Sequence, residues 1–156
     1  MAAGFVVKSS TTATALVATT AKTCCNVVAG ANRQAIICEI SNSFDGITAT
    51  AVPVLVEICG STQAGAGTST AFTPYLMRGI GAALCTGATD YTAEPTVLTP
   101  FKHWLVTPNG GLLVIQSPLG REAQSNLSGS ATLLAIGLRD TAPAAVNSRT
   151  YIEFEE

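Results

Sequence analysis

Few residues in this chain of 156 could perform acid–base or nucleophilic chemistry. His103 is its one histidine. A nucleophilic pair of His103 with Cys59 or Cys85, or a triad with a serine and an aspartate, requires that the histidine lie beside the nucleophile. The spacing gives no reason for such a placement, and the chain contains no Gly-x-Ser-x-Gly elbow. The sequence therefore predicts no catalytic residue and a protein that is not an enzyme.

Metal and cofactor sites also lack their usual ligands. A cupin-type metal site needs several histidines, and a structural zinc site needs paired cysteines such as Cys-x-x-Cys. Cys24 and Cys25 are adjacent, so their side chains should point to opposite faces of a strand. The glycines at 60, 65 and 67 are followed by no lysine, as a phosphate-binding loop would require. We expect no metal, no cofactor and no cofactor-binding residue.

Two glutamates raise the possibility of glycosidase chemistry, which uses a pair of carboxylates. Glu39 and Glu57 both lie in strand-like runs and could face each other across a cleft. Each could equally occupy the solvent side of a half-buried strand, where a charged side chain is expected. We favour this second interpretation.

Other residues point to contacts with protein. Trp104 follows His103, and the two rings are suited to an interface or a half-buried pair. Arg121 and Glu122 are adjacent charges in the segment Ser117–Glu122. A guanidinium can bind a partner's carboxylate through two hydrogen bonds, although a solvated turn with two incidental charges would look the same.

The composition favours a surface occupied by other proteins. Hydrophobic residues make up 47% of the chain and charged residues only 12%, against about 25% in average domains. Mean hydropathy is +0.39. Apolar surface on this scale usually marks an interface. The net charge of −2 and the scattered basic residues argue against nucleic acid. No apolar run is long enough to span a membrane, and the first residues do not resemble a secretory signal.

Apolar and polar residues alternate with a period of two along much of the chain. The clearest strand-like runs are 34–40, 50–59, 131–139 and 150–154, and weaker ones are 12–20 and 23–28. In the second run Val52, Val54, Val56 and Ile58 share one face, which should be buried.

Turn residues separate these runs. Thr107–Gly111 predicts a hairpin between 104–106 and 112–115, and Asn42–Gly46 predicts another turn. Surface loops are expected at 60–70 and 117–130. Segment 73–85 has apolar residues at four-residue spacing, but Gly79 and Gly81 disfavour a helix.

Many short strands with glycine and proline turns predict an all-β fold. We expect an antiparallel, jelly-roll-like β-sandwich, with immunoglobulin-like and tulip-like sandwiches as alternatives. Residues 23–156 form the single domain. Residues 1–22 form either an extended arm that pairs with a neighbouring copy or an ordinary first strand. The five cysteines are expected to be free thiols.

Several strings of residues resemble small virion proteins of tailed bacteriophages, of the capsid cement or decoration type. The resemblance covers about residues 34–156 and is densest after residue 90. It rests on the strings Tyr91–Leu98, Lys102–Trp104, Pro108–Gly111, Ser117–Glu122, Gly137–Arg139, Thr141–Asn147 and Tyr151–Glu156.

The resemblance implies a structural subunit on the capsid surface of a virion, assembled in the host cytoplasm. Its partners would be the major capsid protein and copies of itself, as a homotrimer, with no nucleic acid and no membrane. It supplies no catalytic residues. The alternative is a carbohydrate- or ligand-binding β-sandwich module of a virion fibre or collar. The expected interface residues are Trp104, Arg121, Glu122, Glu155 and Glu156.

Overall fold

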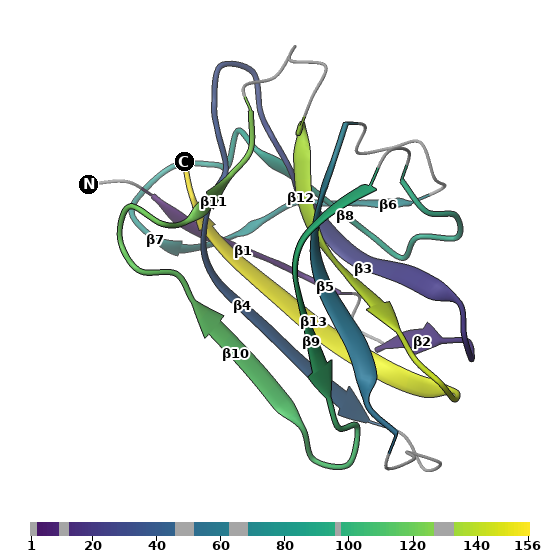
Figure 1. Cartoon of the computed structure of the whole chain (residues 1–156). Coiled ribbons are helices and arrows are strands. Elements are labelled where there is room, and N and C mark those ends of the chain that lie inside the picture. Colours follow the sequence, from purple (N-terminus) through teal and green to yellow (C-terminus); the bar gives the residue numbers. More distant parts are fainter. Residues whose placement is uncertain (1–2, 10–12, 46–51, 63–68, 96–97, 127–132) are drawn as a thin grey trace.

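The alternation of apolar and polar residues produces β-strands along much of the described chain. The computed structural model describes residues 3–9, 13–45, 52–62, 69–95, 98–126 and 133–156, which hold thirteen strands and no helix. The strands form two antiparallel sheets (Figure 1). The predicted all-β sandwich is therefore confirmed.

In the first sheet, sheet A, the spatial order of the strands is β10 (Leu112–Gln116), β4 (Ile36–Asp45), β13 (Val146–Glu155), β1 (Gly4–Lys8) and β7 (Tyr75–Arg78). Two short strands extend it: β11 (Ala123–Gln124) against β4, and β2 (Thr14–Leu16) against β13. The second sheet, sheet B, contains β6 (Thr70–Phe72), β8 (Thr86–Thr89), β3 (Ala21–Val28), β12 (Ala135–Thr141), β5 (Val54–Ser61) and β9 (Leu98–Val106).

Eight of these strands have the order of a jelly roll. In sheet A, β1, β13, β4 and β10 are neighbours, and in sheet B the neighbours are β3, β12, β5 and β9. Along the chain, consecutive members of this set change sheet at every step except from β5 to β9. This arrangement is that of a double-sheet jelly roll, as the sequence predicted.

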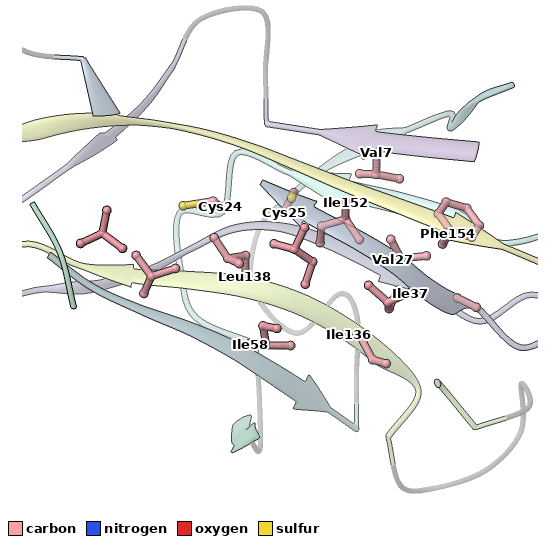
Figure 2. Close-up of a cluster of buried hydrophobic side chains, with 14 of the residues drawn as sticks. Val7, Cys24, Cys25, Val27, Ile37, Ile58, Ile136, Leu138, Ile152 and Phe154 are labelled. Atoms are coloured by element: carbon pink, nitrogen blue, oxygen red, sulfur yellow. The ribbon is translucent and has the colours of Figure 1, made fainter. Parts of the chain in front are cut away.

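The core lies between the two sheets and is filled by every second residue of the strands. Val7, Ile37, Ile152 and Phe154 enter it from sheet A, and Leu138 is among those that enter it from sheet B (Figure 2). The predicted inner face of β5 is confirmed for residues 54, 56 and 58, which are buried. Residue 52 precedes the strand and is exposed.

The predicted hairpin around Thr107–Gly111 is wrong. A turn does form there, with the amide of Gly110 donating to the carbonyl of Pro108. However, β9 pairs with β5 in sheet B, whereas β10 pairs with β4 in sheet A. The turn residues fix a change of direction, but they do not determine whether the next strand pairs or crosses to the facing sheet.

The turn predicted from Asn42 is also misplaced, because β4 continues through Asp45. Residues 46–51 lie outside the described residues, as do parts of the loops predicted at 60–70 and 117–130. Segment 73–85 contains β7 and no helix. Gly79 and Gly81 have φ angles of +96° and +111°, which favour glycine.

Cys24 and Cys25 do not point to opposite faces, contrary to expectation. Both side chains are fully buried. The register of β3 against β12 shifts at this point, since Cys25 pairs with Leu138 but Thr23 pairs with Arg139. Such a bulge interrupts the alternation of side chains, so adjacent residues can share the interior. All five cysteines are unbridged, as predicted.

The outer face of sheet B is partly covered by the chain itself. Residues 90–95 lead from β8 towards β9, and Glu94 accepts hydrogen bonds from the amide and hydroxyl of Thr23. Tyr91 is buried there and accepts a hydrogen bond from Asn26. Part of the outer face of sheet B is therefore shielded from solvent.

Glu57 shows how this cover affects a charged side chain. The sequence placed it on a solvent side, but it is only 9% exposed and forms an ion pair with Arg139 at 2.7 Å. Glu39 lies in β4 of sheet A and accepts a hydrogen bond from Gln116. The two carboxylates belong to different sheets and do not form the pair considered for a glycosidase.

The N-terminal segment takes part in sheet A. Strand β1 pairs with both β13 and β7, and β2 pairs with β13. Residues 1–2 and 10–12 lie outside the described residues.

Candidate protein interface

Exposed apolar side chains gather on the edges of the two sheets. The edge strands are β10 and β7 in sheet A, and β6 and β9 in sheet B. Three of these edges carry exposed large hydrophobic residues: Tyr75, Leu76 and Met77 on β7, Phe101 and Leu105 on β9, and Leu112 and Val114 on β10. Among the remaining described strands, only β13 carries one, Tyr151.

Strand β10 is the least protected of these edges. Its residues, Leu-Leu-Val-Ile-Gln, include no charge and no proline. Leu112 is 66% exposed and Val114 is 48% exposed, while Leu113 and Ile115 pack against the core. By contrast β9 contains Pro100 and Lys102, residue types that discourage pairing at an edge.

The five predicted interface residues differ in their surroundings. Trp104 is half-buried and packs against the core, because it lies beside buried Val56 on the inner face of sheet B. Arg121 is exposed and Glu122 is half-buried, and both line a cleft between the sheets.

The two C-terminal glutamates have partners within the chain. Glu155 forms an ion pair with Arg78 of β7. The carboxylate of Glu156 accepts hydrogen bonds from the amides of Leu84 and Cys85 at 2.8 and 2.7 Å. These contacts join the end of the chain to the residues that follow β7.

Of the five predicted residues, Trp104 therefore faces the core, and Glu155 and Glu156 already have partners within the chain. The apolar edges β7 and β10 were not among the predicted residues. Their apolar side chains could be read from the sequence, but their place at an edge depends on the order of the strands in the sheet.

A polar cluster lies buried between the sheets. The carboxylate of Asp140, in sheet B, accepts hydrogen bonds from Asn42 Nδ2 at 2.9 and 3.0 Å and from the hydroxyl of Ser148, both in sheet A. The thiol of Cys24 lies 3.3 Å from the same carboxylate. Burial raises the pKa of Asp140 to about 6.

The thiol of this cluster is poorly suited to act as a nucleophile. Burial and the nearby Asp140 charge raise the pKa of the Cys24 thiol well above its ordinary value, so the nucleophilic thiolate is disfavoured. The hydrogen bonds instead connect the two sheets. His103, on β9, is exposed and lies opposite Glu57 in the register, away from this cluster.

No group of three or more histidine, cysteine or acidic side chains is placed to hold a metal ion among the described residues. Within that part of the chain there is also no helix long and apolar enough to cross a bilayer. Comparison with protein-family models, with curated proteins and with solved structures found no match for this chain.

Proposed function

We propose that this protein is a structural subunit of a virion that assembles through the edges of its sheets and reinforces a bacteriophage capsid. The observation that carries the proposal is the β10 edge, an uncharged strand with two exposed apolar side chains, Leu112 and Val114. Natural proteins usually protect such edges, because unpaired backbone groups recruit other chains. An edge left open is therefore explained if a partner covers it.

The energetics favour a strand added from outside. A partner strand would satisfy the outward amides and carbonyls of β10 and would cover Leu112 and Val114. Burial of apolar surface contributes about 25 cal/mol per Å², and stable interfaces bury on the order of 1,600 Å² in total. A single five-residue edge is smaller than this, so the interface would also include neighbouring loops.

Copies of the chain are suitable partners. The two edges of sheet A, β10 and β7, are different strands that both carry exposed apolar side chains. A contact between β10 of one copy and β7 of the next would be heterologous, and such contacts form closed rings when the rotation closes. We propose a ring of three, as the resemblance to decoration proteins implies.

The capsid assignment is supported by the same resemblance and by the low charge of the chain. Jelly rolls occur in viral capsid proteins, but also in lectins and cupins, so the fold alone does not assign the function. On a shell, many weak contacts of one trimer with major capsid proteins would add up to high avidity.

Analysis of purified virions would test the proposal. We expect the chain in stoichiometric amounts, with density for it on the head surface in cryo-electron microscopy. Light scattering of the free protein should give the mass of three copies. A protein that is monomeric in solution and absent from the head surface would overturn the proposal.

A further inference from the structure

An apolar cleft opens between the two sheets at the side where β9 and β10 form their edges. Its volume is about 300 Å³. Six large apolar side chains line it: Ile37, Ile40 and Ile115 from sheet A, Ile58 and Phe101 from sheet B, and Leu133. The cleft therefore reaches from the surface to residues of the core cluster, which include Ile37, Ile40 and Ile58.

The backbone at Gly60 allows the wall of this cleft to form. A Cβ at that position would lie 2.0 Å from Leu133 Cδ1 and 2.6 Å from Phe101 Cζ. Both side chains thus occupy the space that a side chain at position 60 would fill. A larger residue at position 60 would displace them, so the shape of the wall depends on this glycine.

The mouth of the cleft is polar and carries more positive than negative charge. Lys102 and Arg121 line it together with a single carboxylate, that of Glu122. Neither cation forms an ion pair with another described residue, whereas Arg78, Arg139 and Arg149 all do. Two cations against one carboxylate beside an apolar cleft favour a ligand that has an apolar body and an anionic end.

We propose that this cleft binds a medium-chain monocarboxylate, with its hydrocarbon tail between the sheets and its carboxylate between Lys102 and Arg121. The volume suits such a tail. A water molecule takes up about 30 Å³ in the liquid, and at a similar volume per methylene the cleft holds roughly ten carbons. Although Ile115 of β10 lines the cleft, the proposed binding does not require assembly through β10.

Binding can be followed with the intrinsic fluorescence of Trp104, the one tryptophan of the chain. Trp104 lies two residues from Lys102 on the same face of β9. Decanoate should change the emission of the purified full chain saturably. Decan-1-ol, which has the tail without the charge, should bind about tenfold more weakly, and propionate, which has the charge without the tail, should not bind.

Three variants test the proposed contacts. Lys102→Met and Arg121→Met should each weaken decanoate binding about tenfold and leave decanol binding unchanged. Arg33→Met is the matched control, because this exposed arginine does not line the cleft, and it should bind decanoate as the unmodified chain does. All three positions are exposed, so circular dichroism should show the same sheet spectrum for each variant.

Ala123→Leu would place a larger side chain at the cleft lining and should weaken both decanoate and decanol. The proposal is overturned if decanoate gives no saturable change with the unmodified chain. It is equally overturned if decanol binds as tightly as decanoate, or if Arg33→Met weakens decanoate binding as much as Lys102→Met and Arg121→Met do.

Discussion

At the scale of single residues, the carboxyl group of Asp140 couples stability to pH. Its pKa rises from the ordinary 3.8 to about 6, chiefly through burial. In that interval the folded protein binds a proton that the unfolded chain releases, so the free energy of unfolding falls as pH rises. The stabilisation is complete below about pH 4 and lost above about pH 6, and it amounts to about 3 kcal/mol.

Asp140→Asn should remove this dependence. The amide keeps the size of the side chain but does not titrate, so its stability should be nearly constant from pH 4 to pH 7. Urea unfolding at four pH values measures the difference. Asp45→Asn serves as the control, since Asp45 is an exposed partner of Arg149 and should retain the dependence on pH. An equal slope for Asp140→Asn and the unmodified chain would contradict the assignment.

The ion pair of Glu57 with Arg139 should matter more than the pair of Asp45 with Arg149. The side chains of the first pair are 11% and 20% exposed, and those of the second are 47% and 46% exposed. Arg139→Met leaves a nearly buried carboxylate without its partner and should cost about 2–4 kcal/mol in denaturant unfolding. Arg149→Met should cost less than about 1 kcal/mol. Equal losses would show that the cover over sheet B does not protect the first pair from water.

At the scale of elements, a charge on β10 should prevent self-association. Leu112→Lys or Val114→Lys places an ammonium at the edge, where it would have to be buried on pairing. We expect each variant to remain folded and to elute as a monomer, with its mass measured by light scattering. Leu119→Lys is the matched control, because Leu119 is 99% exposed in a connection and lies outside every described strand. Association that survives in both β10 variants would show that another surface is used.

The period of two predicted several strands and the buried faces of β5 and β13, including the inward Ile152 and Phe154. In β4 it failed, because Ile37 and Ile40 are both buried while Ile36 and Cys38 are half-buried. It could not predict the sheet to which each strand belongs, because arches between sheets and hairpins within a sheet use the same turn residues. The sequence pattern also failed to predict that Glu57 is buried and that Cys24 and Cys25 both point into the core. A covering segment and a bulge are non-local features that alternation does not encode.

The β10 edge on which the proposed interface rests could not be predicted from the sequence. Low charge led us to expect a surface that other proteins cover, but the residues chosen were the conspicuous aromatic and charged ones. Trp104 faces inwards because of its position in the alternation of β9, opposite Val56. Leu112 and Val114 have ordinary sequence neighbours, and only the strand order shows that β10 has no partner on one side.

At the scale of the whole molecule, the cysteines report on global unfolding. Four are buried to 2% exposure or less, and Cys38 is the only half-buried one. Alkylation of the native protein should label Cys38 first, and denaturation without reductant should yield five labels, as counted by mass spectrometry. Fewer than five labels in the denatured, freshly purified protein would reveal a disulfide. Rapid native labelling of all five would show that the sandwich opens readily.

The pairing of β1 with β13 has a consequence for how the protein is made. Val7 lies opposite Ile152, so the first strand finds its main neighbour in the last strand of the described chain. Ribosomes add about 5–20 residues per second, and a chain of 156 residues therefore takes on the order of 10–30 s to emerge. Until β13 emerges, Phe5 and Val7 lack the strand that pairs along the whole of β1, although β7 becomes available earlier. The jelly roll can close only after β13 has emerged, and until then the nascent chain depends on chaperones or on its few charges to avoid aggregation.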